Sequence, residues 1–332
     1  MRQIKIILKT LVASLTFIAS LSLFGMSPAS AEVPWPKAQT IRFIVPFTPG
    51  SGTDVIARIL ANKLSDTLGT SIFVENKPGA GGTIGAAIVA KSEPNGYTFL
   101  IQSSGHVVNP FLYTSLPYDT LKDFAGITPL VQLPNVMVTS PNAGYTSVSD
   151  LVSKTLAEPG VKNYASAGNG SATHMNAEKF KLAAKLNANH IPYKGTPDAI
   201  TDTMAGRVDW FFSPIVSALP LIKDGKLQAL AVGTNKRAAV LPNVPTTIES
   251  GIPNSSYIFW VGILAPSKTP VKIINQMNAG ILQVMKDPAI MEQLSKLGAE
   301  PMLMSPAKFD QMIKTEMDAS AILVKESKMS VN

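Results

Sequence analysis

The sequence predicts an α/β protein, because short apolar strands alternate with amphipathic helices along most of the chain. Strand–helix–strand order repeated in this way is typical of mostly parallel sheets covered by helices. A length of 332 residues favours two such domains over one. The expected strands are IRFIVPF, SIFVEN, YTFLIQ, NYASAG, NHIPY, VDWFF and LQALAVG, and the expected helices between them cover 53–68, 83–92, 171–186, 196–205 and 214–224.

The chain from about Val271 onward is mainly helical in pattern, with too few strands to form a domain of its own. We therefore expect it to pack back onto the first sheet. Two long extended stretches contain no helical pattern, GITPLVQLPNVMVTS and SYIFWVGILAP. They are the candidates for connections that cross between two lobes.

The first 31 residues have the three parts of a secretory signal peptide. Arg2, Lys5 and Lys9 precede the apolar run LVASLTFIASLSLFG, and a small-residue site ends at Ala31, where we expect cleavage. The alternative, a membrane anchor, needs about 20 apolar residues, which this run does not reach. The chain has no cysteine, which excludes disulfides and a lipid-attachment cysteine. The mature protein is expected to be free in an exported compartment and not membrane-spanning.

The charge of the mature chain is mildly positive. The sequence has 29 Lys+Arg and 22 Asp+Glu, and removal of the three basic residues of the signal leaves 26 − 22 = +4. These charges are scattered, without a basic run, which argues against nucleic acid as a partner. A weak positive field favours an anionic small molecule.

Two segments run from a strand through Gly and Ser into a helix, PFTPGSGTDVIARIL and YASAGNGSATHMNAEKF. Glycine allows a tight turn, and the first N–H groups of a helix have no internal partner. Such helix starts suit phosphate or carboxylate. The alternative is that Ser51, Thr53 and Ser171 only cap the helices. The presence of two such loops, one per expected lobe, favours an anion site.

Nucleotide binding does not fit the glycine spacing. Neither loop contains G-x-x-x-x-G-K-[ST]. The third cluster, GAGGTIG at 79–85, has Ile84 where the dinucleotide fingerprint requires its last glycine, and we interpret it as a turn and helix start. No cofactor is therefore expected.

A secreted α/β hydrolase with Ser171 as nucleophile is the alternative function. His174 lies one helical turn after Ser171, but there is no G-x-S-x-G elbow and no evident acidic partner. The other histidines, His106 and His190, are far apart in sequence, so no metal site is predicted. Asp54 either complements the helix dipole and loop amides or contacts an ammonium group of the ligand.

The residues from VPFTPGSGTDVIARIL through GAGGTIG and EPNGYTFL resemble the opening signature of the Bug-type solute receptors of tripartite tricarboxylate transporters. The resemblance continues in order through LPYDTLKDF, NYASAGNGSATH, IPYKGTPDAITDTMAGRVD, LPNVPTTIESG and LGAEP, so it covers nearly all of the mature chain. It implies a type II periplasmic binding protein fold, with two α/β lobes joined by crossover strands around a ligand cleft. The implied division is a signal peptide at 1–31, a first lobe at 32–137 and 258–332, and a second lobe at 138–257.

The resemblance implies a non-enzymatic receptor that captures a mono- or dicarboxylate by lobe closure and delivers it to membrane transporter subunits. We expect a monomer, because nothing in the sequence demands a larger assembly. A receptor that regulates a signalling partner is a further alternative. The chain departs from the family at Ser51, where a second glycine is usual, at Ser213, where an acidic residue is common, and at Asn95, where Asp is common. The implied ligand-binding residues are Phe47, Thr48, Ser51, Gly52, Thr53, Ser103, His106, Asn135, Ser166, Gly168, Asn169, Gly170, Ser171, His174 and Ser213.

Overall fold

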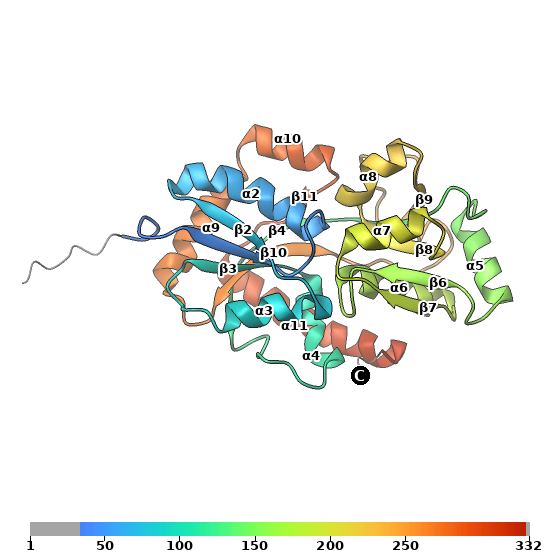
Figure 1. Cartoon of the computed structure of the whole chain (residues 1–332), viewed down its shortest axis with the longest axis horizontal. Helices are drawn as coiled ribbons and strands as arrows, with labels where there is room; N and C mark the ends of the chain where they lie inside the picture. Colours follow the sequence, from blue (N-terminus) through green and yellow to red (C-terminus); the bar gives the residue numbers. More distant parts are fainter. Residues whose placement is uncertain (1–33, 330–332) are drawn as a thin grey trace, which may run out of the picture. The chain divides into compact units, whose positions relative to one another are not determined.

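A computed structural model describes residues 34–329, and the expected signal peptide at 1–31 lies outside the described residues. The larger of two sheets has six strands in the order β11-β4-β10-β3-β1-β2 (Figure 1). It joins strands from both ends of the chain. Its strands are β1 (Ile41–Val45), β2 (Ile72–Asn76), β3 (Thr98–Ser103), β4 (Phe124–Gln132), β10 (Trp260–Pro266) and β11 (Glu300–Pro301).

Helices cover both faces of this sheet. Phe43 faces one apolar cluster and its neighbour Ile44 faces another, because side chains alternate along a strand. Helices α2, α9 and α10 bury apolar residues in the first cluster, and α3, α4 and α11 do so in the second. Their bounds are α2 (Gly52–Leu68), α3 (Thr83–Ala90), α4 (Asn109–Leu112), α9 (Val271–Val284), α10 (Pro288–Lys296) and α11 (Pro306–Ser327).

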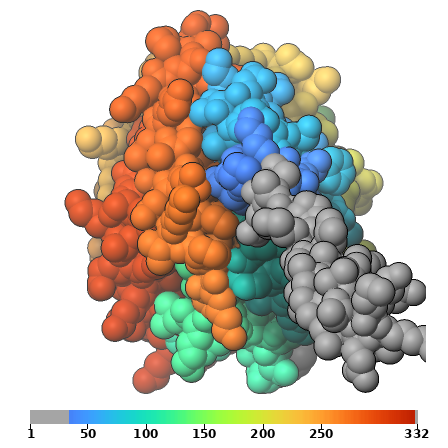
Figure 2. All heavy atoms as spheres, turned by 90° about the vertical axis from the view of Figure 1, so that its left-hand side faces the viewer, coloured from blue at the N-terminus to red at the C-terminus, as the bar shows by residue number. Residues whose placement is uncertain are grey.

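The helices that follow residue 270 return to the first sheet, as the sequence predicts. α9 packs against α2 and β4, and α11 packs against β4. Figure 2 shows the orange residues of this region beside the blue residues of the early chain. Lys63 of α2 also forms an ion pair with Asp287 at 2.8 Å. The helices after residue 270 therefore complete the two layers that α2 and α3 begin early in the chain.

The smaller sheet has five strands in the order β7-β6-β8-β5-β9. α6 and α5 contribute to the cluster around Tyr164 and Trp210 on one face, whereas α7 and α8 cover the other. The strands are β5 (Asn135–Thr139), β6 (Asn163–Ser166), β7 (Asn189–Pro192), β8 (Trp210–Pro214) and β9 (Gln228–Val232), and the helices are α5 (Val148–Ala157), α6 (Ala172–Ala184), α7 (Thr196–Met204) and α8 (Ile215–Lys223).

The α/β architecture is confirmed, but the expectation of mostly parallel sheets is wrong. Among the strand pairings of the described residues, four are parallel and five are antiparallel. β4 and β10 belong to the two extended stretches that connect the sheets. Because β4 and β10 are antiparallel to their neighbours in the first sheet, these crossover strands account for the antiparallel pairings there.

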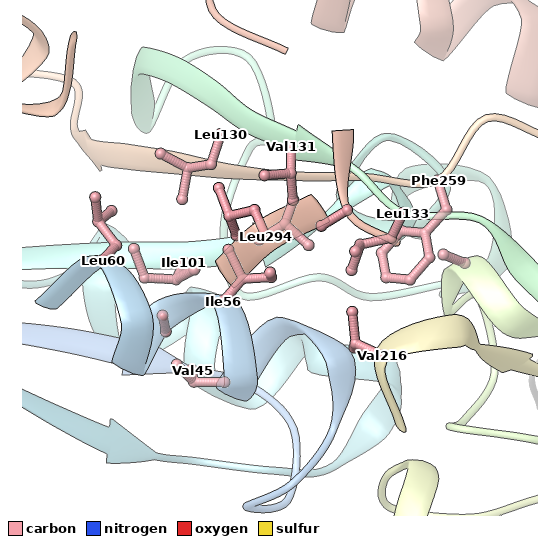
Figure 3. Close-up of a cluster of buried hydrophobic side chains, with 14 of the residues drawn as sticks. Val45, Ile56, Leu60, Ile101, Leu130, Val131, Leu133, Val216, Phe259 and Leu294 are labelled. Atoms are coloured by element: carbon pink, nitrogen blue, oxygen red, sulfur yellow. The ribbon is translucent and has the colours of Figure 1, made fainter. Parts of the chain in front are cut away.

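The chain passes from the first sheet to the second at Leu133 and Pro134 and returns after Val232, entering the first sheet again at Trp260. The two passages are bonded to each other, since the Leu133 amide donates to the Phe259 carbonyl oxygen at 2.8 Å. Figure 3 shows Leu133, Phe259 and Val216 together at one end of the buried cluster that continues from one sheet to the other. The expected lobe boundary at 137 and 138 falls within β5.

Candidate functional site

The first of the two predicted loops connects β1 to α2. Gly50 has a φ of +83°, which glycine adopts without strain, and its amide donates to Asp54 Oδ2 at 2.9 Å. Ser51 stands at the N-cap position and its amide donates to the Thr48 carbonyl oxygen. The amides of Gly52 and Thr53 have no acceptor among the described residues. These two N–H groups are the orphan donors that a helix start offers to an anion.

Asp54 holds this loop through its carboxylate. Its oxygens accept hydrogen bonds from Gly50, Arg58 and Asn76 at 2.8–3.0 Å. Burial by itself would raise the pKa of Asp54, but these hydrogen bonds outweigh it and lower the pKa. Both carboxylate oxygens are thus engaged, which agrees with loop capping rather than contact with a ligand ammonium.

The second loop connects β6 to α6 and uses neutral acceptors. Gly168 and Gly170 both have positive φ angles, +121° and +74°. The Gly168 amide donates to Ser166 Oγ at 3.0 Å, and the Gly170 amide donates to His174 Nδ1 at 3.1 Å. Ser171 Oγ accepts from the His174 amide and so caps α6. The predicted glycine donors are therefore used inside the loop.

The amides that remain available in this loop belong to the first turn of α6. Those of Ala172 and Thr173 have no acceptor among the described residues. Both residues line the same cavity as Gly52 and Thr53. Two helix N-termini, one from each sheet, therefore converge on one space.

This cavity is small: it leaves about 20 Å³ for the centres of water-sized molecules, within about 240 Å³ of unoccupied space that includes open solvent. No charged side chain lines it, so an anion there would be stabilised by amides, hydroxyls and helix dipoles. Its aromatic and proline walls come from both halves of the chain. The lining residues are Phe47, Ser51, Gly52, Thr53, Ser103, Ala167, Ser171, Ala172, Thr173, Thr196, Pro214 and Phe259.

Six of the fifteen predicted site residues line the cavity: Phe47, Ser51, Gly52, Thr53, Ser103 and Ser171. Six others lie in the two loops or in the strand and helix that flank the second loop, without lining the cavity: Thr48, Ser166, Gly168, Asn169, Gly170 and His174. The remaining three lie elsewhere. His106 packs against Tyr118 and Phe124, Asn135 donates to Asn176 Oδ1, and Ser213 donates to the Pro214 carbonyl oxygen.

Residues 56–329 match the family described as "Tripartite tricarboxylate transporter family receptor". The protein BugT of Bordetella pertussis is 36% identical over 303 residues, which cover 91% of this chain and 92% of BugT. The chain belongs to this receptor family.

Solved structures agree with the receptor fold. The periplasmic binding protein BugD superposes with a TM-score of 0.84 at 31% identity, covering 88% of this chain and 99% of BugD. A Rhodopseudomonas palustris protein solved with adipate gives a TM-score of 0.86 at 31% identity, covering 90% of this chain and all of that one. The resemblance to Bug-type receptors and the two-lobed type II periplasmic binding protein fold are thereby confirmed.

The two halves of the receptor touch directly beside the cavity. The Thr196 amide at the start of α7 donates to Ser51 Oγ at 3.1 Å, and Ser217 Oγ donates to the Gly50 carbonyl oxygen at 3.1 Å. The cluster GAGGTIG forms a turn and the start of α3, as expected. It also contacts the second loop, because a Cβ on Gly81 would overlap the Asn169 carbonyl oxygen.

The receptor family is not an enzyme family, and the chain lacks the contacts of a serine nucleophile. Ser171 Oγ bonds to the amide of His174, whose imidazole Nδ1 accepts from Gly170 instead. Burial lowers the pKa of His174 to about 3, which makes it a weak base. The hydrolase alternative is not favoured.

Sequence reasoning missed half of the lining residues of this receptor: Ala167, Ala172, Thr173, Thr196, Pro214 and Phe259. Thr196 had a usable signal, since Gly195, Pro197 and Asp198 mark a helix start directly after a predicted strand. β6 and β7 are parallel, so the residues after them leave the same sheet edge. Phe259 comes from the distant crossover segment, for which no local signal exists.

Proposed function

We propose that this receptor captures an organic anion, a mono- or dicarboxylate, in the periplasm and delivers it to the membrane subunits of a tripartite tricarboxylate-type transporter. The observation that carries the proposal is the convergence of two helix starts, with amides of Gly52, Thr53, Ala172 and Thr173 available, on one uncharged cavity. Amide donors at a helix start favour carboxylate oxygens whatever carbon skeleton is attached.

A dicarboxylate matches the two-sided placement of the amide donors, and because the cavity leaves only about 20 Å³ for the centres of water-sized molecules, the lobes must move apart to admit it. One carboxylate can take its hydrogen bonds from α2 and the other from α6, with Phe47, Pro214 and Phe259 around the carbon chain. Ordered water can bridge the longer polar contacts. The neighbour solved with adipate supports this class of ligand.

Lobe closure is the proposed mechanism. The proposed lobes are those expected from the sequence, 32–137 with 258–332 and 138–257, except that the first boundary moves to Leu133 and Pro134, because β5 pairs entirely within the smaller sheet. A ligand bonded to both helix starts binds the closed state better than the open one and so shifts the population towards closure. The contacts of Ser51 with Thr196 and of Ser217 with Gly50 would then add to the closed state.

Export and assembly complete the proposal. A signal peptide at 1–31 would direct the chain to the periplasm. No helix of the described residues is both long and apolar enough to cross a membrane. We propose that the mature receptor is a monomer.

The substitution Ala172→Pro tests the amide donors directly. Ala172 is the first helical residue of α6, where proline is well tolerated, and Ser171 already has the extended conformation that must precede proline. The change removes one N–H from the cavity without breaking the helix. We expect the affinity for dicarboxylates to fall by about tenfold or more in calorimetry, which corresponds to one lost charge-assisted hydrogen bond.

Val271→Pro is the matched control, since Val271 is the first helical residue of α9 and is 72% exposed, outside the cavity lining. It should leave affinity unchanged. The ligand is found by a thermal-shift screen of dicarboxylates, aromatic acids and amino acids, with adipamide as an uncharged control for adipate. If no carboxylate raises the Tm, or if Ala172→Pro binds as tightly as the parent, the proposed site is wrong.

A further inference from the structure

Four rings stack beneath the second loop and form what we call the aromatic ladder: Trp210, Tyr164, His190 and His174. The first three face one another because β8, β6 and β7 pair in register at these residues. The Tyr164 ring lies 4.9 Å from Trp210 and 5.0 Å from His190, centroid to centroid. His174, from α6, stacks on His190 at 3.8 Å with only 7° between the ring planes.

The histidine end of the ladder holds both glycine amides of the loop. His174 Nδ1 accepts from the Gly170 amide at 3.1 Å. His190 Nε2 lies 2.6 Å from Ser166 Oγ, which accepts from the Gly168 amide at 3.0 Å. Each imidazole therefore orients the amide of one glycine. His174 acts on Gly170 directly, and His190 acts on Gly168 through the Ser166 hydroxyl.

These contacts determine where the protons of the two rings reside. An imidazole nitrogen that accepts a hydrogen bond carries no proton, so neutral His174 must be protonated at Nε2. Ser166 Oγ already accepts from Gly168, and in its contact with His190 Nε2 either atom could be the donor. We assign the proton to Ser166 Oγ, because this hydroxyl has no other acceptor among the described residues. His190 is then protonated at Nδ1.

Both rings are neutral at physiological pH. Burial lowers the pKa of His174 to about 3 and that of His190 to about 2, and the ammonium of Lys181 acts in the same direction. Among the described residues, the carboxylate that faces them is Glu178, and it already accepts from Tyr164 Oη and from Lys181 Nζ. Neutral stacked rings can lie in close contact without charge repulsion.

We propose that His190, which does not line the cavity, is a positioning residue for the anion site. By orienting Ser166 and supporting His174, it keeps the Gly168 and Gly170 amides turned into the loop. The loop then presents the amides of Ala172 and Thr173 to the ligand. The expected effect on ligand affinity rests on the proposed function, whereas the expected effect on loop geometry does not.

The tautomers test the geometry without any ligand. In the ligand-free receptor, ¹⁵N NMR should show His174 protonated at Nε2 and His190 at Nδ1. The opposite tautomer at His190 would overturn the proposal.

Two substitutions then test the consequence. Gln can present an amide oxygen near the place of Nε2, so His190→Gln should retain the acceptor, whereas His190→Leu removes it. We expect slow hydrogen exchange of the Gly168 amide in the parent and in His190→Gln, and fast exchange in His190→Leu. Affinity for the dicarboxylate found in the screen should fall by about tenfold in His190→Leu and stay within about threefold in His190→Gln.

Trp210→Phe is the matched control, because it changes the other end of the ladder and contacts neither glycine. It should leave Gly168 exchange and affinity unchanged. Parent-like exchange and affinity in His190→Leu would overturn the proposal. If the parent receptor binds no carboxylate, the proposed function fails, and the tautomer and exchange measurements still decide the positioning role.

Discussion

The two loops that meet at the cavity have the same local design but are held by different chemistry. In the first loop, the Gly50 amide is bonded to the carboxylate of Asp54, which is paired with Arg58. In the second, the corresponding acceptors are the Ser166 hydroxyl and the His174 imidazole, both uncharged. The comparison shows that one backbone task, orienting amides at a helix start, can be performed by an ion pair or by neutral groups.

This difference predicts that the two loops are sensitive to opposite changes in charge. An ion-paired carboxylate is disturbed by removing its charge, and buried neutral imidazoles are disturbed by adding one. This contrast leads to four predictions: the first concerns the contact between the loops, the second the first loop, the third the buried histidines, and the fourth the serines that begin the two helices.

The largest effect is expected for Gly195→Ala, where the lobes meet. Gly195 has an extended backbone, so alanine adds no strain there, but its Cβ would overlap Thr48 Oγ1 and lie 2.8 Å from Ser51 Oγ. We expect the affinity for ligand to fall by about 100-fold, or about 2.7 kcal/mol, while the unligated protein folds normally. Calorimetry and thermal unfolding measure the two quantities. The double variant with Thr48→Ala should recover part of the affinity, and full affinity in Gly195→Ala would argue against closure through these contacts.

Asp54→Asn should weaken the contacts that hold the first loop. The substitution keeps the shape of the side chain but leaves Arg58 without its charge partner, and Asp54 is 2% exposed. We expect a loss of about 2 kcal/mol in unfolding free energy, measured by urea titration. Asp318→Asn, at an exposed position of α11, is the control and should change stability by less than about 0.5 kcal/mol. An equally small loss in Asp54→Asn would show that the ion pair is dispensable.

Mild acid should destabilise the protein through its buried histidines. The pKa of His106 is lowered to about 4 and that of His174 to about 3, both mainly by burial. In the unfolded chain these histidines take up protons near pH 6.5. Their contribution to the unfolding free energy is therefore fully present above that pH and declines towards pH 4. Each such histidine should cost roughly 1 kcal/mol between pH 7 and 5.5.

His106→Leu checks the size of this contribution. Neither ring nitrogen of His106 has a hydrogen-bond partner among the described residues, so leucine should be tolerated. The loss of stability between pH 7 and 5.5 should shrink by roughly 1 kcal/mol in this variant. The contribution of Asp54, whose pKa is lowered, is lost only at more acidic pH. An unchanged slope would contradict the buried, neutral state of His106.

The smallest expected effect separates the two serines. Ser171 Oγ caps α6, so Ser171→Ala should cost about 1 kcal/mol of stability. Ser51 occupies the same position in α2 but makes no cap bond; its Oγ accepts from Thr196 in the other lobe. Ser51→Ala should therefore change unligated stability by less than about 0.5 kcal/mol and act mainly on affinity. Equal stability losses in the two variants would contradict this division.

The sequence predicts the local parts of this site well. The helix that follows the first loop was expected at 53–68 and is observed at Gly52–Leu68, because glycine, serine and apolar spacing mark it within a few residues. α5 was missed, although Ser147 caps it and Val148, Leu151 and Thr155 are buried at helical spacing.

The parts that could not be predicted depend on contacts between distant residues. Gly168 and Gly170 looked like ligand donors, and only the three-dimensional structure shows that Ser166 and His174 use their amides. His106 was expected in the cleft wall but is enclosed by Tyr118 and Phe124. The direction of the crossover strands likewise depends on pairings across the chain.

The path of the chain between the sheets has a consequence for biosynthesis. β5 to β9 occupy one uninterrupted stretch, so a nascent chain holds all strands of the smaller sheet once Val232 has emerged. In the larger sheet, β10 lies between β4 and β3, and it is synthesised later than both. Until Trp260–Pro266 leave the ribosome, the earlier strands lack their central neighbour, and the half of the molecule made first is the half completed last.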